Sequence, residues 1–356
     1  MVEGVVSRKR DHIRICVEED VDFKKKTTWL EYVELVHNPL PELNVDDIVL
    51  EAKFLEKNFN YPIIIEAMTG GVPEALEINS NLARAASELN IPLGLGSQRA
   101  GIYNPDLRQT YRIVRDIAPD IFVIGNIGGV QLAVEGVELA EKAVEMVNAD
   151  ALAIHLNSLQ EQIQVGGTAT FRGVVKAIEK TVERLSVPVI VKEVGCGIPM
   201  KVAKILESIG VKAIDVAGAG GTNWTLIEKI RAEFSGDTEK KMLAEVFLEW
   251  GIPTAASVIE VASTVKIDVV ASGGVRTGLD IAKSISIGAS MAGIARPLLK
   301  PAQENVQSIL EYLMRLIKEL KTAMYLVGCR NIFELKNAEK VLTGPLLEWC
   351  KQRSLI

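Results

Sequence analysis

The sequence is poor in cysteine, with four in 356 residues and no two of them in a Cys-x-x-Cys pair. This spacing excludes the common zinc motifs and a disulfide framework, so a reducing compartment is expected. There is no run of about 18 apolar residues, as a membrane-spanning helix needs, and the first residues lack the apolar stretch of a signal peptide. We therefore expect a cytoplasmic protein that does not bind membranes.

Excess positive charge is also missing. Lys and Arg total 40 against 46 Asp and Glu, which gives a formal net charge of -6. Nucleic-acid and anionic-membrane binders need a positive excess, so neither partner is expected. A small anionic ligand remains possible, because it needs only a local group of Arg and Lys.

Low-complexity segments and long linkers are absent, and eight short apolar runs alternate with segments of helical spacing. Continuous apolar runs are typical of parallel strands that are buried on both faces. Eight such units predict an α/β fold of the (β/α)8 TIM-barrel type, with a doubly wound open sheet as the alternative. The runs cover residues 62–65, 91–95, 121–124, 151–154, 187–191, 213–216, 269–271 and 290–294.

Three regions follow from this pattern. Residues 1–60 form an N-terminal extension that contributes to the substrate site, and residues 61–300 form the barrel. Residues 301–356 are expected to be helices packed on the barrel or at a subunit interface, because apolar residues recur at helical spacing from 303 to 324. Nearly every apolar run ends in polar or glycine-rich residues, which is where barrel enzymes place their sites.

The last two runs are followed by loops suited to a phosphate. Ser272, Gly273 and Gly274 follow one run, and Ala295 and Arg296 follow the other. Glycine lets backbone N–H groups approach an anion closely, and barrels commonly bind phosphate after strands seven and eight. The alternatives are that these glycines only form tight turns, or that the phosphate belongs to a phosphosugar substrate.

Other strand ends favour a flavin as the phosphate-bearing ligand. Ala67, Met68 and Thr69 can lie against an isoalloxazine ring, while Ser97 and Asn126 can bond its nitrogen and oxygen atoms. A cation at the strand end, such as Lys192, would stabilise negative charge on a reduced flavin. The alternative for Lys192 is a structural ion pair with Glu66 or Glu161.

The densest polar group follows residue 154. It contains His155, Asn157, Gln160 and Glu161, although the whole chain has only three histidines. Gln160 is suited to orienting a substrate, and Glu161 could bind Mg²⁺ together with phosphate oxygens, or simply interact with a helix N-terminus.

A second anion site is also predicted. Arg99 at a strand end could form it with Arg8 and Lys9, unless that N-terminal pair is only a solvated basic tail.

Together these residues resemble type 2 isopentenyl-diphosphate delta-isomerases. The resemblance runs from residue 8 to about residue 300, and its basic N-terminal motif and His-x-Asn-x-x-Gln-Glu motif are specific. One departure occurs where many members have Pro-Glu-Gly, because this chain has Gly166-Gly167-Thr168. The matching segments are residues 8–13, 67–71, 96–99, 126–128, 155–161, 220–224 and 272–280.

The resemblance implies interconversion of isopentenyl and dimethylallyl diphosphate with reduced FMN, Mg²⁺ and a reductant such as NADPH. It implies catalytic roles for Gln160, His155 and Asn157, and Glu161 as metal ligand. It also implies a homo-oligomer, a tetramer or octamer. The residues implied to bind the diphosphate substrate are Arg8, Lys9, Ser97, Gln98, Arg99 and Gln160, and those implied to bind FMN are Ala67, Met68, Thr69, Ser97, Asn126, Lys192, Thr222, Ser272, Gly273, Gly274, Ala295 and Arg296.

Two other functions stay open. An FMN oxidoreductase of the 2-hydroxy acid type would need a His base near an Arg pair after the sixth or seventh strand, and residues 218–224 contain no His. A flavin-free phosphosugar-binding barrel would purify as a colourless protein.

Overall fold

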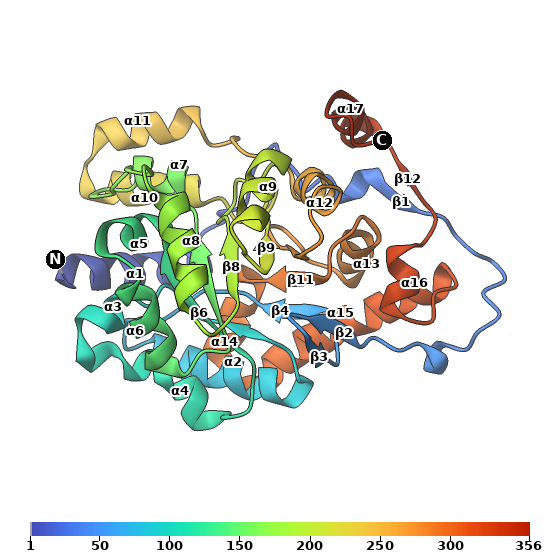
Figure 1. Cartoon of the computed structure of the whole chain (residues 1–356), viewed down its shortest axis with the longest axis horizontal. Helices are drawn as coiled ribbons and strands as arrows, with labels where there is room; N and C mark the ends of the chain where they lie inside the picture. Colours follow the sequence, from blue (N-terminus) through green and yellow to red (C-terminus); the bar gives the residue numbers. More distant parts are fainter. Residues whose placement is uncertain (1) are drawn as a thin grey trace.

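The fold is a closed barrel of eight parallel strands with helices around it (Figure 1). It is seen in a computed structural model that describes residues 2–356, with side chains from residue 6 onward. In barrel order the strands are β10 (Asp268–Ala271), β11 (Met291–Ile294), β4 (Ile63–Ile65), β5 (Leu93–Gly94), β6 (Val123–Gly128), β7 (Ala151–His155), β8 (Val189–Lys192) and β9 (Ala213–Asp215).

Each of the eight apolar runs overlaps one barrel strand, so the predicted TIM barrel is confirmed and the open sheet is wrong. The helices around and beyond the barrel are α1 (Val2–Glu18), α2 (Ala75–Leu89), α3 (Arg99–Tyr103), α4 (Gln109–Ile117), α5 (Gly129–Glu135), α6 (Glu138–Val147), α7 (Ser158–Ile163), α8 (Val174–Arg184), α9 (Met200–Ser208), α10 (Trp224–Ser235), α11 (Thr238–Val246), α12 (Thr254–Ala262), α13 (Gly278–Ser286), α14 (Leu299–Glu304), α15 (Val306–Leu326), α16 (Ile332–Lys336) and α17 (Gly344–Gln352).

The strand register aligns three polar side chains at one level of the barrel. His155 on β7 pairs with Lys192 on β8, and Lys192 pairs with Asp215 on β9. Along each barrel strand, side chains point alternately into the interior and away from it. The register therefore sets a cation and a carboxylate side by side, one level above an apolar interior.

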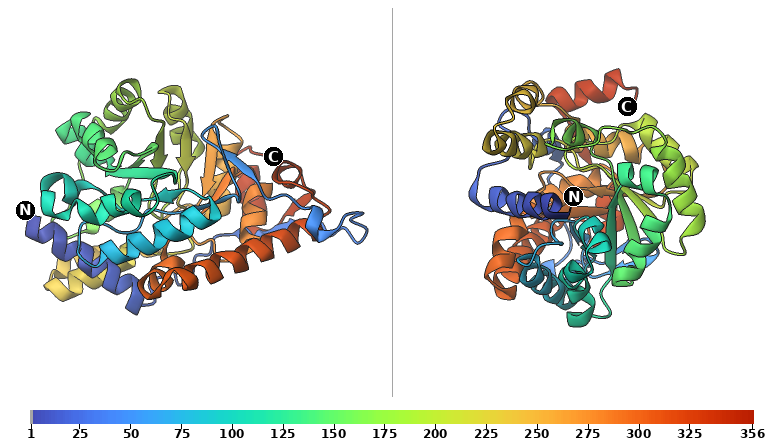
Figure 2. Two further views of the ribbon diagram at one scale, coloured as in Figure 1. Left: turned by 90° about the horizontal axis from the view of Figure 1, so that it is seen from below. Right: turned by 90° about the vertical axis from the view of Figure 1, so that its left-hand side faces the viewer.

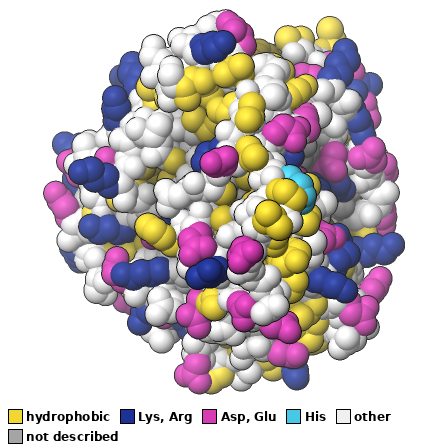
Figure 3. Space-filling view, turned by 90° about the vertical axis from the view of Figure 1, so that its right-hand side faces the viewer, with side chains coloured by type: hydrophobic (Ala, Val, Ile, Leu, Met, Phe, Trp, Pro, Cys, Tyr) yellow, Lys and Arg dark blue, Asp and Glu magenta, His cyan; other side chains and the backbone are white. Residues whose placement is uncertain are grey.

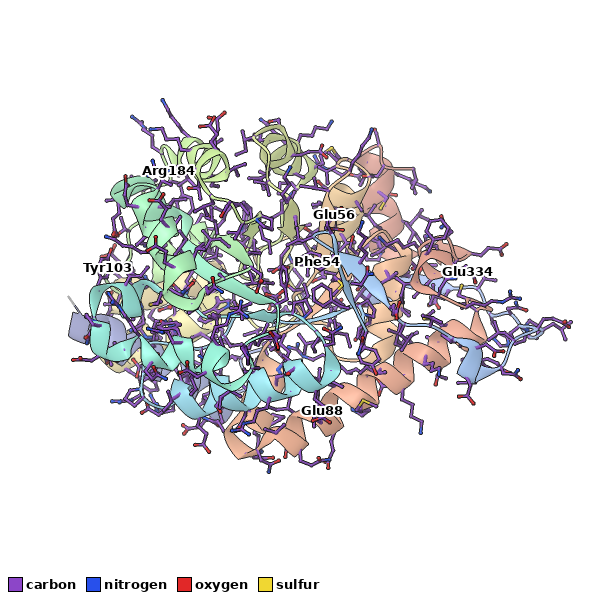
Figure 4. All side chains as sticks on the ribbon, turned by 60° about the horizontal axis from the view of Figure 1, so that its bottom comes forward. Phe54, Glu56, Glu88, Tyr103, Arg184 and Glu334 are labelled. Atoms are coloured by element: carbon purple, nitrogen blue, oxygen red, sulfur yellow. The ribbon has the colours of Figure 1, made fainter. Side chains whose placement is uncertain are left out.

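That apolar interior is closed from the opposite end by a hairpin of β2 (Ala52–Phe54) and β3 (Lys57–Phe59). Phe54 and Phe59 pack there with Ile64, Ile190 and other strand residues. Figure 4 places Phe54 near the centre of the molecule, whereas Tyr103 and Arg184 lie at its periphery. Because this end is filled, a ligand can enter only from the C-terminal ends of the strands.

The N-terminal helix lies at that open end. α1 packs against α3, α10 and α14, and one view of Figure 2 shows it crossing the end of the barrel. A short strand further along the extension, β1 (Val33–Leu35), pairs with β12 (Lys340–Leu342) near the C-terminus. The extension thus touches both the mouth and the far side of the barrel.

The C-terminal helices also pack on the barrel. α15 contacts α2 and α13, burying Leu313, Leu316 and Leu320, and α17 contacts α12. The face at this end carries interspersed side chains of both charges with apolar groups between them (Figure 3). Across residues 2–356, no helix combines the length and apolarity needed to cross a bilayer.

Candidate active site

A cavity of about 240 Å³ opens at the C-terminal ends of the barrel strands, with α1 as part of its wall. Strand ends and the loops after them supply most of its lining, as the sequence predicted. The predicted residues that line it are Arg8, Lys9, Ala67, Met68, Thr69, Ser97, Arg99, Asn126, His155, Asn157, Gln160, Glu161, Lys192, Thr222, Ser272, Gly273, Gly274, Ala295 and Arg296.

Gln98 is the predicted substrate contact that the structure does not bring to the cavity. Its side chain is fully buried, accepts from the Asn126 N–H at 2.8 Å and donates to the Ala143 carbonyl at 2.8 Å. Its neighbours Ser97 and Arg99 face the cavity instead. The Gln98 side chain therefore joins the end of β5 to β6 and α6, and does not line the cavity.

The loops after β9 and β10 approach each other too closely for side chains. A Cβ on Gly221 would lie 2.3 Å from the Gly274 nitrogen, and Gly274 itself has a φ of +85°. Within the described residues, the Gly273 and Gly274 N–H groups have no acceptor. Bare backbone amides of this kind suit a phosphate.

Two arginines lie beside this cradle. The carboxylate of Asp22 pairs with Arg276 at 3.1 Å and with Arg296 at 2.7 Å. The buried Nε of Arg296 nevertheless has no partner among the described residues. An orphaned guanidinium nitrogen next to free backbone amides fits the phosphate of FMN.

Lys192 forms the floor of the cavity together with two buried carboxyl groups. Its ammonium lies 2.8 Å from Asp215 and 3.7 Å from Glu66. Burial acts to lower the pKa of Lys192, but the two carboxylates outweigh it and raise the pKa. Lys192 is therefore a permanent cation, and it pairs with Glu66, as one alternative had it, and also with Asp215, which the sequence did not indicate.

Gln160 is held at both ends of its amide. Its Oε1 accepts from Asn157 at 3.2 Å, and its Nε2 donates to Glu228 at 3.2 Å. Since a carboxylate can only accept, Glu228 fixes which end of the amide is the nitrogen. The amide oxygen of Gln160 therefore has a defined direction in the cavity wall.

Glu228 is fully buried on α10 and is the centre of a charged group. It accepts from His12 Nε2 at 2.8 Å and from Arg231 Nη1 at 2.7 Å. Burial opposes its ionisation, but His12 and Arg231 lower the pKa of Glu228 to about 2. Because burial also lowers the pKa of His12, Arg231 is the partner that keeps Glu228 ionised at neutral pH.

His155 is a neutral imidazole at neutral pH. Burial, and then the charges of Lys192 and Arg99, lower the pKa of His155 to about 3. Its Nδ1 lies 2.8 Å from Asn126 Oδ1, which can only accept, so the proton is on Nδ1. An anion bound against Nε2 would favour protonation of the ring.

Glu161 is buried under the loop that follows α7. Its carboxylate accepts from the Thr168 N–H at 2.7 Å and from the amides of Asn157 and Gln164 at 3.3 and 3.4 Å. Gly167 must be glycine here, because a Cβ would lie 2.1 Å from the Glu161 carbonyl oxygen. Between residues 2 and 356 no three His, Cys, Asp or Glu side chains form a ready metal site.

Arg8 and Arg99 face the cavity with no hydrogen-bond acceptor or carboxylate partner among residues 6–356. Burial, and then Arg99, lower the pKa of Arg8, so the two like charges lie close together. Two unpaired guanidinium groups in one wall form an anion site.

Lys9 is placed differently from the two arginines. Its ammonium donates to the carbonyls of Gly70 and Ser97 at 2.7 and 2.8 Å and to the Tyr111 hydroxyl at 3.0 Å. These contacts anchor α1 to the barrel, so Lys9 does not belong to a solvated basic tail.

Three residues that matter here were not selected from the sequence: Asp22, Asp215 and Glu228. The only available signal was an acidic residue within an apolar run, as Asp215 is in the run 213–216. Asp22 and Glu228 lie in segments with no strand-end position, so pattern alone could not find them.

Comparisons with known proteins agree with this geometry. The model of the FMN-dependent dehydrogenase family matches residues 126–341. Isopentenyl-diphosphate delta-isomerase of Methanothrix thermoacetophila is 46% identical over 98% of this chain and 97% of its own. The enzymes of that name from Methanothermobacter thermautotrophicus and Halobacterium salinarum are 47% and 49% identical, over 98% of this chain and 97% and 96% of theirs.

Solved structures show a similar fold at low identity. A putative lactate oxidase of Pediococcus acidilactici has a TM-score of 0.68 at 14% identity, covering 96% of this chain and 94% of its own. A mandelate oxidase variant with (S)-mandelic acid has a TM-score of 0.65 at 16% identity, covering 96% of this chain and 98% of that one. At such identities the likeness concerns the fold alone.

Proposed function

The chain belongs to the isopentenyl-diphosphate delta-isomerase family, with the FMN-dependent dehydrogenase fold, and on this premise we propose how its site interconverts isopentenyl and dimethylallyl diphosphate. The reaction adds a proton to one end of an allylic unit and removes one from the other. It has no net redox change, so the flavin must act without being consumed.

The residues present fit FMN. The glycine cradle and Arg296 would hold its phosphate, and Met68 and Thr69 would lie against its ring. Lys192 would face the part of the ring that gains negative charge on reduction. When bound, the reduced flavin supplies an electron-rich ring that can relay a proton and stabilise positive charge.

The substrate diphosphate would bind at the unpaired Arg8 and Arg99, which is the single observation that carries the proposal. A second phosphate site, separate from the glycine cradle, distinguishes this cavity from that of a flavin barrel with an uncharged or carboxylate substrate. Glu161 would hold Mg²⁺ against the diphosphate once the Thr168 N–H and the two amides give up its oxygens. His155 and Asn157 would complete the polar wall.

Gln160 would orient the reacting end of the substrate. Its amide is held between Asn157 and Glu228, so its oxygen has a fixed place from which it can stabilise positive charge that develops on the substrate. The helix α1, anchored by Lys9, would cover the bound substrate and exclude water from a cationic species.

The testing experiment is an anaerobic assay of isopentenyl diphosphate with FMN and Mg²⁺, reduced by NADPH or dithionite. Dimethylallyl diphosphate should form only under reducing conditions and should need Mg²⁺. Absence of product with fully reduced, FMN-loaded protein would refute the proposal. In a separate aerobic assay, oxidation of lactate or mandelate with consumption of O2 would favour the 2-hydroxy acid oxidoreductase instead.

A pair of variants separates catalysis from folding. Gln160→Leu should abolish turnover and leave the FMN absorption spectrum unchanged. Arg10→Ala is the matched control, because Arg10 belongs to the same basic motif as Arg8 and Lys9 but is exposed and paired with Glu74. Loss of FMN from the Gln160 variant would instead assign this residue a structural role.

The proposal includes a homo-oligomer. Three apolar side chains at a spacing of four residues stay exposed on and just after α11: Met242 (62%), Val246 (76%) and Trp250 (60%). Such a stripe is typical of a surface that packs on another helix. Sedimentation of the protein should therefore give a mass well above that of one chain.

A further inference from the structure

The buried charges beneath the cavity do not balance. Lys192 is the one cation on this floor, but two carboxyl groups surround it, those of Asp215 and Glu66. The relative exposure is only 9% for Lys192, 2% for Asp215 and 7% for Glu66. If both acids were ionised, the floor would carry one excess negative charge with little water to solvate it, which is costly.

Asp215 is the acid that lies closer to the Lys192 ammonium. It accepts from the Ser272 hydroxyl at 2.5 Å and from the Ala217 N–H at 3.2 Å, with the Lys192 ammonium at 2.8 Å from its other oxygen. That other oxygen, Oδ2, has no aligned donor among the described residues. It is therefore free to accept a proton shared by a neighbouring acid.

Glu66 is the neighbouring acid. Its carboxyl lies farther from Lys192, and its one other donor is the Ala67 N–H at 3.3 Å. Burial, and then the charge of Asp215, raise the pKa of Glu66 to about 7. The side chain also lines both the active-site cavity and a cavity of about 10 Å³ just beneath it, in the barrel interior.

The other groups near this floor do not replace Glu66. Burial raises the pKa of Glu193 to about 7 as well, but its carboxylate accepts from three successive backbone N–H groups of its own loop, at Val194, Gly195 and Cys196, and does not line the active-site cavity. His155 is neutral and bonded to Asn126. Gly293 packs on the Glu66 side chain, where a Cβ would lie 2.6 Å from Cγ, so glycine at this position leaves the space that the side chain occupies.

We propose that Glu66 is a positioning residue that takes up a proton when the bound flavin is reduced, so that the floor stays neutral against the negative charge of the reduced ring. The inference rests on the proposed binding of FMN next to Lys192. In the balanced half-reaction, FMN gains two electrons from a donor such as dithionite and one proton to become the anionic reduced form, and the Glu66 carboxylate gains a second proton.

The consequence is measurable as a proton count. Each proton taken up per two electrons lowers the midpoint potential by about 30 mV per pH unit. Between about pH 7.5 and 8.5, above the raised pKa of Glu66, wild-type protein should take up two protons per two electrons. Glu66→Gln is permanently neutral there, so it should take up one, and its reduction should be at least tenfold more favourable.

The experiment is a potentiometric titration of FMN-loaded protein by dithionite against reference dyes at several pH values. Asp268→Asn is the matched control, because Asp268 begins β10 at the opposite end of the barrel and accepts only from the Leu55 N–H. This variant removes a barrel carboxylate but should keep the two-proton slope. Glu66→Asp, which retains a titrating group, should keep it as well.

The outcomes distinguish a failure of the proposed role of Glu66 from a failure of the isomerase proposal. A one-proton slope in FMN-loaded wild-type protein, or a two-proton slope in Glu66→Gln, would overturn the role of Glu66 and leave the isomerase proposal standing. If Glu66→Gln fails to retain FMN, a one-proton slope in wild-type protein or in Glu66→Asp still overturns the role of Glu66. Wild-type protein that takes up no FMN would overturn the proposed function and this inference together.

Discussion

Replacing Glu228 by Gln tests the charged group behind Gln160. The pKa of Glu228 falls from an ordinary 4.5 to about 2 in the folded protein. A carboxyl group whose pKa is lower in the folded than in the unfolded protein stabilises the fold at pH values above the unfolded pKa. This stabilisation is lost as the pH falls through the folded pKa. A shift of this size corresponds to at most roughly 3 kcal/mol at neutral pH, since each pKa unit is about 1.4 kcal/mol and His12 adds to the shift only when it is protonated.

We therefore expect Glu228→Gln to lose up to roughly 3 kcal/mol of unfolding free energy at pH 7. The loss should shrink as the pH falls below 4.5, because the carboxyl group of the unfolded wild-type chain then takes up a proton that the folded protein, with a pKa of about 2, does not. Urea unfolding midpoints at pH 7, 5, 4 and 3.5 measure it. Glu233→Gln is the control, because Glu233 lies on the same helix but its side chain is 38% exposed, so its loss should cost under about 1 kcal/mol.

The same variant should slow the reaction. An amide oxygen at position 228 is a weaker acceptor than a carboxylate, so Gln160 would be held less firmly in its present direction. We expect kcat to fall about tenfold with little change in KM, since a difference of about 1.4 kcal/mol is a factor of ten. An unfolding deficit that is equal at pH 7 and pH 3.5, or an unchanged kcat, would refute the charged role of Glu228.

Three further predictions concern binding, closure and stability. Arg99→Ala should raise KM for the diphosphate about 10–100-fold and weaken its salt dependence, because a charged hydrogen bond contributes about 1.5–3 kcal/mol; an unchanged KM would place the diphosphate elsewhere. Lys9→Met removes the three contacts that anchor α1, so trypsin should cut within residues 2–18 faster, with FMN retention as the folding control. Arg353→Leu should lower stability by about 1–2 kcal/mol by unpairing the buried Glu260, and kcat should stay the same; a lower kcat would instead link α17 to the active site.

The sequence by itself determined the barrel and most of its mouth. Short apolar runs that alternate with segments of helical spacing predict buried parallel strands, and the C-terminal ends of such strands meet at one edge. For that reason Asn126, His155 and Lys192 could be placed in one cavity from their positions after the runs, and the structure places them there. The glycine loops were equally predictable, because close backbone approach requires glycine whatever the partner.

Only the tertiary structure decided which polar side chains work together. Successive side chains after β5 point in opposite directions. Gln98 therefore points between β6 and α6, whereas Ser97 and Arg99 point into the cavity. Glu228 reaches Gln160 across 68 residues of sequence, and Asp22 reaches Arg276 across 254. Hydrogen bonds and ion pairs depend on distances of a few ångströms between atoms, and a linear pattern fixes the face of an element but not the neighbour that the fold brings against it.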